Sequence, residues 1–264
     1  MNYKMILEYD GSRYNGWQRQ GNTNNTIQGK LEEILSKYFC QNIEIHGSGR
    51  TDAGVHAMGQ VANFKVSMDT FAKKQDDYVS KEDLCENKLL HNINSYLPED
   101  IRIISLEAVD DRFHARLNAK TKTYSYRICL SPKKNVFERK YCALLPQPTP
   151  SLNVDAMKTA ALHFLGEHDL VGFSDTKTKK STIRRVDSIT FSQENIDSCE
   201  YLIVDFTGNG FLYHTVRLMM GTLVQIGLGN CTADIIKKIL DTKDRKEVPY
   251  MAPAEGLFLM NVEY

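Results

Sequence analysis

The sequence predicts an α+β fold made of two halves, each an antiparallel sheet covered by helices. Two observations support this class. Short runs of β-branched and aromatic residues alternate along the chain with longer runs whose apolar residues repeat at helical spacing. The order of these runs (strand, helix, strand, polar insert, helix, strand) then recurs in the second half. We place the boundary near Asp110, which defines an N-terminal domain over 1–109 and a C-terminal domain over 110–264.

The N-terminal half opens with a strand and contains two amphipathic helices. The expected strands are Met5–Tyr9, Ile43–Ile45, Val61–Val66 and Ile101–Val109. The expected helices are the apolar stripes Ile27–Leu35 and Leu89–Leu97. Asn25 or Thr26 is placed to cap the first helix, and Pro98 to end the second. The charged segment Ser67–Glu86 is interpreted as a surface excursion that precedes the second helix.

The C-terminal half follows the same principles. The expected strands are Thr123–Ile128, Val186–Phe191, Tyr201–Phe206 and Leu257–Val262. The expected helices are Met157–Leu165, His214–Ile226 and Ile235–Leu240. Asp155 is predicted to cap the first of these helices, and Thr232 the last.

The composition describes a globular protein: 42% of the 264 residues are hydrophobic and 25% are charged. No run approaches the ~20 apolar residues of a membrane helix, and no signal peptide is visible, so the cytoplasm is the expected compartment. The six cysteines are scattered without Cys-x-x-Cys spacing. We therefore expect reduced, packed thiols, with neither a metal site nor a disulfide framework.

The net charge is zero, but the charges are unevenly distributed. The stretch 112–140 holds nine Lys and Arg against one acidic residue, and the stretch 170–186 holds five against one. These two basic stretches carry +8 and +4, so the rest of the chain carries −12. Such asymmetry is typical of a surface that binds phosphates, although a solvated basic surface is an equal alternative for the first stretch.

The most informative segment is His46–Val61, which contains four glycines and, at its centre, Arg50, Thr51 and Asp52. Glycines permit positive φ and close backbone approach, so the segment is predicted to be a shaped loop between strands. A carboxylate on such a loop suits a nucleophile or a general base. From these residue types alone, an ordinary Asp-Ala-Gly turn with a surface ion pair is the alternative. His56 is interpreted as a loop-structuring residue and Trp17 as a core residue.

Several separated motifs resemble one family. They are EYDGSRYNGWQRQ at 8–20, GSGRTDAGVHAMGQV at 47–61, FHAR at 113–116, NGFLYHTVR at 209–217 and AEGL at 254–257. Their order and content resemble the tRNA pseudouridine synthase A family from end to end. One departure is Thr215, which stands where an apolar residue is expected and puts the local packing in question.

The resemblance implies two ferredoxin- or RRM-like halves with an active-site cleft between them. It implies isomerisation of uridine to pseudouridine at positions 38, 39 and 40 of the tRNA anticodon stem-loop, without a cofactor or metal. By resemblance, Asp52 is the nucleophile, Tyr124 lies against the uracil, Arg50 holds the flipped nucleotide and Arg217 pairs with the aspartate. The family also implies a homodimer, with tRNA as the partner and no membrane association.

Two other functions fit part of the sequence. An RNA-binding module without catalysis would share the basic stretches but would not need a glycine-framed Arg-Thr-Asp. An aspartate-nucleophile phosphatase would carry Asp-x-Asp-x-Thr, whereas this chain has Asp52-Ala53-Gly54-Val55 and lacks the second aspartate. Product formation from tRNA, together with a magnesium-dependent phosphatase assay, distinguishes these alternatives.

Overall fold

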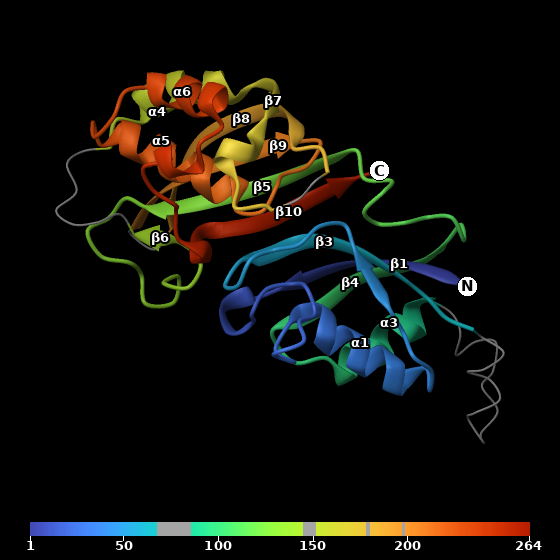
Figure 1. The fold of residues 1–264 in the computed structure, drawn as a ribbon. Helices are drawn as coiled ribbons and strands as arrows, with labels where there is room; N and C mark the ends of the chain where they lie inside the picture. The colour runs from blue at the N-terminus through green and yellow to red at the C-terminus, as the bar shows by residue number, and fades with distance from the viewer. Residues whose placement is uncertain (68–85, 145–151, 178–179, 197–198) are drawn as a thin grey trace. The chain divides into compact units, whose positions relative to one another are not determined.

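The fold is taken from a computed structural model, which describes residues 1–67, 86–144, 152–177, 180–196 and 199–264. The chain divides into two compact units (Figure 1). The N-terminal unit comprises Met1–Ala119 with Leu259–Tyr264, and the C-terminal unit comprises Lys120–Phe258. The strands of the described residues belong to one ten-stranded sheet, and the strands and helices of each unit are described in turn.

The sheet of the N-terminal unit is antiparallel. Strand β1 (Asn2–Tyr9) lies between β3 (His56–Lys65) and β4 (Ile101–Val109), and β2 (Ile45–Gly47) pairs with β3. Strand β10 (Leu257–Glu263) is next to β3 in the strand order. Alternate side chains of β1 are buried, as the period of two requires. Three of the expected strands of this half are confirmed, whereas the strand expected over Ile43–Ile45 begins only at Ile45 and runs to Gly47.

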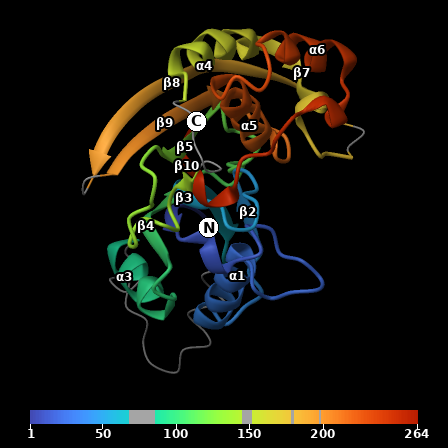
Figure 2. The same cartoon turned by 90° about the vertical axis from the view of Figure 1, so that its left-hand side faces the viewer.

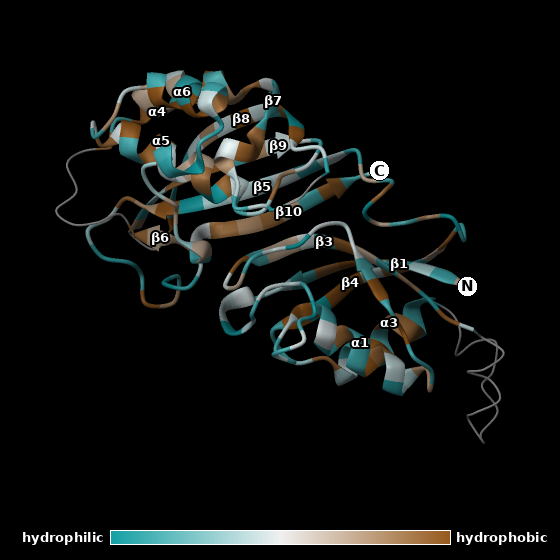
Figure 3. Ribbon diagram, viewed as in Figure 1, coloured by the Kyte–Doolittle hydropathy of each residue, from teal (hydrophilic) through white to brown (hydrophobic). Residues whose placement is uncertain are grey.

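Two helices cover one face of this sheet: α1 (Ile27–Tyr38) and α3 (Glu86–Tyr96) (Figure 1). Leu31, Leu35, Leu89 and Ile93 of the predicted stripes are all fully buried. Hydrophilic residues are interleaved with the hydrophobic ones along both helices (Figure 3), as expected for helices with one solvent-facing side. Of the two candidate caps it is Thr26 that caps α1, because its hydroxyl accepts the Gly29 amide at 3.2 Å.

The sheet of the C-terminal unit has the strand order β5-β9-β8-β7. Its antiparallel strands are β5 (Thr121–Cys129), β9 (Cys199–Gly208), β8 (Ile183–Ile196) and β7 (Gly166–Asp169). The short β6 (Ala143–Leu144) runs parallel to β5. Strands β8 and β9 form the predicted pair but are longer than expected, and Figure 2 shows them as two long strands side by side.

The helices of this unit are α4 (Val154–Ala161), α5 (Thr215–Gly227) and α6 (Asp234–Thr242). They lie on one face of the sheet (Figures 1 and 2). Two predicted caps are wrong. Asp155 is the second residue of α4, and Asn153 caps this helix by accepting the Ala156 amide at 2.9 Å. The residue at the cap of α6 is Ala233, whose side chain cannot accept a hydrogen bond, and not Thr232.

Strands and helices in these arrangements confirm the α+β class. The segment interpreted as a surface excursion falls largely on residues 68–85, which lie outside the described residues. Within the described part of the chain, no helix has the length and apolar character needed to cross a membrane.

Candidate active site

The loop that carries Arg50, Thr51 and Asp52 connects β2 to β3 in the N-terminal unit. Its first anchor is the single tryptophan. Trp17 is 2% exposed, and a Cβ atom added to Gly47 would lie 2.6 Å from the indole ring. Only glycine allows the strand to approach the indole so closely. The interpretation of Trp17 as a core residue is therefore confirmed. Its indole packs against Gly47, the last residue of β2 before this loop.

A buried glutamine forms the second anchor. The Ser48 hydroxyl donates to Gln60 Oε1 at 2.7 Å, and Gln60 Nε2 donates to the Gly49 carbonyl at 3.1 Å. The Ser48 amide also donates to the Val61 carbonyl at 2.7 Å. Both side chains are buried, so these bonds satisfy polar groups that would otherwise be costly. Gln60 was not assigned a role from the sequence, because nothing near it indicates which loop it would reach.

Thr51 is held from two directions. Its hydroxyl lies 2.8 Å from the Tyr9 hydroxyl, and its carbonyl accepts the Trp17 amide at 3.0 Å. Burial raises the pKa of Tyr9 above its usual range. The phenol therefore stays neutral at physiological pH and remains a hydrogen-bonding anchor.

Asp52 lies at the start of a tight turn and is partly buried. Its carbonyl accepts the Val55 amide at 3.1 Å, and Gly54 adopts a φ of +79° within the turn. His56 follows the turn, is buried, and its Nδ1 accepts the Gly11 amide at 3.1 Å. This contact ties His56 to the segment at 8–20, which agrees with the expected structural role of His56.

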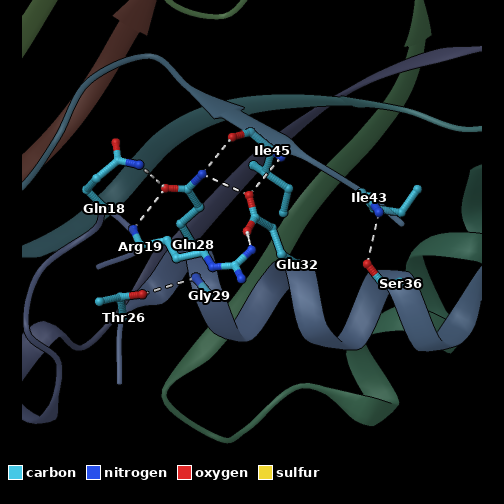
Figure 4. A network of polar contacts seen from close by, with 9 residues as sticks. All are labelled: Gln18, Arg19, Thr26, Gln28, Gly29, Glu32, Ser36, Ile43 and Ile45. Atoms are coloured by element: carbon cyan, nitrogen blue, oxygen red, sulfur yellow. Dashed lines mark hydrogen bonds and ion pairs between the residues drawn. The ribbon is translucent and has the colours of Figure 1, made fainter. Parts of the chain in front are cut away.

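Arg50 is exposed, and its side chain is bonded to Gln18, which belongs to a network of polar side chains shown in Figure 4. Arg50 Nε donates to Gln18 Oε1 at 2.9 Å, and Gln18 Nε2 donates to Gln28 Oε1 at 2.6 Å. Gln28 in turn donates to Glu32 at 2.8 Å and to the Ile45 carbonyl at 3.0 Å. Helix α1 and strand β2 thereby hold the side chain that supports Arg50.

Many of the contacts that hold the loop after β2 come from one stretch of the chain, the opening motif at 8–20. Tyr9, Trp17 and Gln18 each contact this loop, and Gly11 contacts His56 directly after it. Tyr14 adds a carbonyl that accepts the Gly54 amide at 3.4 Å. A carboxylate on a loop supported in this way is held in one place, which nucleophilic or general-base chemistry requires.

Tyr124 lies in the C-terminal unit, on β5, opposite Phe206 of β9. It is 7% exposed, and its ring meets Phe211 edge to face at a centroid distance of 5.6 Å. Tyr126 lies on the same strand face and is fully buried, and its hydroxyl donates to the Pro253 carbonyl at 2.7 Å. Phe211, from the predicted arginine-bearing segment, therefore helps to orient the predicted substrate tyrosine.

Arg217 is the third residue of α5, also in the C-terminal unit. Its Nε donates to the Ala252 carbonyl at 2.8 Å, and the Ala252 amide donates to the Arg217 carbonyl at 3.0 Å. The side chain is partly buried, which distinguishes it from an ordinary arginine on a helix surface. Thus Arg50 and Asp52 share one loop of the N-terminal unit, whereas Tyr124 and Arg217 belong to the C-terminal unit.

Thr215, the departure noted in the sequence, is 0% exposed, and its Oγ1 has no hydrogen-bond partner among the described residues. Thr215→Val keeps the shape and removes a buried polar group, so it is expected to raise the free energy of unfolding by about 1 kcal/mol. Urea unfolding followed by circular dichroism measures this change. Thr222→Val is the control: the Thr222 hydroxyl donates to the Leu218 carbonyl at 2.9 Å, so the same substitution is expected to give no gain. An unchanged or lower stability for Thr215→Val would contradict the prediction.

The cysteines within the described ranges form no cluster with metal-binding geometry. Among the described residues, no group of three or more His, Cys, Asp and Glu side chains could hold a metal ion. Cys129 and Cys142 are buried, and burial raises the pKa of both thiols, to about 11 for Cys142. These two thiols are therefore packed side chains of low reactivity.

Comparison with known proteins agrees with the resemblance noted in the sequence. A model of the family described as tRNA pseudouridine synthase matches residues 5–118 and 160–264. A tRNA pseudouridine synthase A 2 from Bacillus cereus is 44% identical over 264 residues, covering 100% of this chain and 99% of the relative. A tRNA pseudouridine synthase A from Thermoanaerobacter is 36% identical with the same coverage. The chain therefore belongs to the tRNA pseudouridine synthase family, which is a family of isomerases.

Proposed function

We propose that this chain converts uridine to pseudouridine in the anticodon stem-loop of tRNA, at positions 38, 39 and 40, with Asp52 as the nucleophile. The observation that carries the proposal is the loop itself, because the opening motif, Gln60 and Trp17 all serve to hold Arg50, Thr51 and Asp52. A turn of no catalytic importance would not need so much of the chain to support it.

The reaction conserves atoms and oxidation state. The N1–C1′ bond breaks, the uracil turns, C5 bonds to C1′, and the hydrogen from C5 is released as a proton while N1 gains one. Asp52 acts as a carboxylate nucleophile on the flipped-out nucleotide. No cofactor or metal is needed for this balance.

The remaining site residues bind the substrate. Tyr124 lies against the uracil, and its orientation is supported by the edge-to-face contact with Phe211. Arg217 pairs with the nucleophile, and the Nε–Ala252 hydrogen bond directs its guanidinium. Arg50 holds the flipped conformation, supported by Gln18. The proposal requires Asp52 from one ferredoxin-like half and Tyr124 and Arg217 from the other to meet at one uridine.

We further propose that the enzyme works in the cytoplasm as a homodimer in which one tRNA contacts both subunits. The basic stretches 112–140 and 170–186 bind the phosphate backbone of the stem by shape and charge. Sedimentation of the protein alone and with tRNA tests the dimer. A monomer that modifies tRNA at the full rate would contradict it.

Tritium release tests the activity. Because the C5–H bond is replaced by C5–C1′, tRNA labelled at uridine C5 is expected to release tritium to water. Three transcripts, each with uridine at only one of positions 38, 39 and 40, then test the positions separately. An absence of release from all three would contradict the proposed function, and release from only one would contradict the proposed range of positions.

The basic surface should make tRNA binding depend on salt. Arg112 and Arg116 are exposed, so replacing both by Gln is expected to lower the slope of log Kd against log salt by about one for each lost phosphate contact. Fluorescence anisotropy with labelled tRNA measures the slope. Arg102→Gln is the control, because this exposed guanidinium lies 3.6 Å from Glu8 and outside both basic stretches. Equal slopes for all three proteins would contradict a role for the first stretch.

A further inference from the structure

One carboxylate outside the predicted site joins two segments: the start of the helix that carries Arg217, and a stretch whose Ala252 hydrogen-bonds Arg217. Asp175 follows the short helix η3 (Leu170–Phe173) in the C-terminal unit. Its Oδ2 lies 2.6 Å from His214 Nδ1, and its Oδ1 accepts Arg245 Nε at 2.8 Å. Arg245 Nη2 also lies 3.5 Å from Oδ2, so the arginine meets the carboxylate with two nitrogens.

The first segment is the start of α5. The Asp175 amide donates to the Tyr213 carbonyl at 3.2 Å, and the Ser174 hydroxyl donates to the same carbonyl at 3.1 Å. His214 then adopts a left-handed φ of +67° as the N-terminal cap residue of the helix. A non-glycine residue in this region costs about 1–3 kcal/mol unless its surroundings hold it there. The contacts from Ser174 and Asp175 stabilise this conformation of His214, which lies three residues before Arg217.

The second segment runs from Arg245 to Ala252. Arg245 begins the short helix η4 (Arg245–Glu247), and the chain then passes over α5. A Cβ atom added to Gly221 would lie 2.2 Å from the Tyr250 carbonyl oxygen, so this segment packs directly on the helix backbone. Ala252 follows: its carbonyl accepts Arg217 Nε, and its amide donates to the Arg217 carbonyl.

We propose that Asp175 is a positioning residue for Arg217: by binding His214 and Arg245 together, it sets the helix start and the Ala252 carbonyl that direct the guanidinium. This inference rests on the role proposed above for Arg217. In this role Asp175 acts only through Arg217.

The charge of Asp175 suits this role. Burial alone would raise its pKa, but the hydrogen bonds from His214 and Arg245 outweigh burial and hold the pKa below its usual range. The folded protein has the lower pKa for Asp175, so the ionised carboxylate contributes its full stabilisation above the pKa of the unfolded chain. This stabilisation is lost only as the pH falls through the lowered pKa of the folded protein. At the neutral pH of a tRNA modification assay, the carboxylate is fully ionised.

Asp175→Asn tests the role, because the amide keeps the shape but lacks the charge that holds both partners. We expect kcat for uridine isomerisation to fall by about 10- to 100-fold, the effect of a displaced catalytic geometry, with the Kd for tRNA within about twofold. Asp169→Asn is the matched control. This carboxylate also lies beside η3 and is partly exposed, but its partners are Thr182 at 2.5 Å and Lys243 at 2.7 Å instead of His214 and Arg245.

A double-mutant cycle separates positioning from general destabilisation. In an Arg217→Lys background, the further loss of kcat on adding Asp175→Asn is expected to disappear, because the group that Asp175 positions is gone. The same loss in both backgrounds, or a kcat for Asp175→Asn within twofold of the wild type, would overturn the proposal.

Hydrogen exchange supplies a measurement that does not depend on activity. The Ala252 amide donates to the Arg217 carbonyl, so Asp175→Asn is expected to speed its exchange at least tenfold more than Asp169→Asn does. Equal exchange at Ala252 in the two variants would overturn the proposal. If the wild type forms no pseudouridine, the proposed function fails, and exchange at Ala252 still decides whether Asp175 holds this segment.

Discussion

Asp52→Asn is expected to lower the rate of pseudouridine formation by about 10⁴-fold or more, the scale of loss when a covalent nucleophile is removed. An amide has the size of the carboxylate but cannot attack or take a proton in its place. The loop is expected to keep its conformation, because its anchors come from Ser48, Thr51 and Gln60. Single-turnover tritium release with saturating enzyme measures the chemical step directly.

Asp10→Asn is the matched control for this experiment. Asp10 caps the turn at 11–13 by accepting the Ser12 amide at 2.9 Å, and its Oδ1 lies 3.2 Å from His56 Nδ1. It is therefore a carboxylate at the base of the same loop, and asparagine caps turns equally well. We expect its rate to stay within about tenfold of the wild type, since no step of the chemistry uses it. A rate for Asp52→Asn near the wild-type value, with tRNA binding intact, would show that another group is the nucleophile.

Trp17→Ala is expected to lower the free energy of unfolding by about 3–5 kcal/mol, the usual cost of deleting a large buried aromatic side chain. The indole packs against Gly47 and lies 6.1 Å from the Tyr9 ring, so its loss leaves a cavity between the opening motif and the strand that precedes the loop. Activity should fall with stability, because the same cavity removes support from Thr51 and Asp52. Urea unfolding by far-ultraviolet circular dichroism measures the change, since the tryptophan signal is absent from the variant.

Tyr96→Ala is the control for the loss of an aromatic ring. Tyr96 is 65% exposed at the end of α3, where its ring lies 6.1 Å from that of Tyr38. Its truncation is expected to cost less than about 1 kcal/mol. If the two truncations cost the same, Trp17 does not occupy the structural position described here.

Local patterns predicted most of the secondary structure, because a helix or strand with one buried face has apolar residues at regular spacing in the sequence. The stripes that became α1, α3 and α5 are examples. The start of α4 was not predictable in this way. The Asn153 amide donates to the Gly227 carbonyl at 2.9 Å, so the end of α5 determines where α4 begins. A contact across more than 70 residues leaves no signal in the few residues around Asp155.

The same distinction applies to the candidate site. The glycines and the Arg-Thr-Asp group identified the loop between β2 and β3, because their residue types report a local backbone shape. The residues that hold the loop, such as Tyr9 and Gln60, carry ordinary side chains whose importance comes from distant partners. Asp175 is a further case, since its two partners lie 39 and 70 residues along the chain. Side chains of this kind are found only when the fold brings their partners together.

The position of the single tryptophan gives the enzyme a built-in optical probe. The indole lies beneath the strand that leads into the Asp52 loop, and its backbone amide is bonded to Thr51, so a change in the loop alters the environment of the ring. With no other tryptophan in the chain, the whole emission comes from this one place. Stopped-flow fluorescence of the unlabelled protein can therefore follow this loop after tRNA is added, separately from the release of tritium.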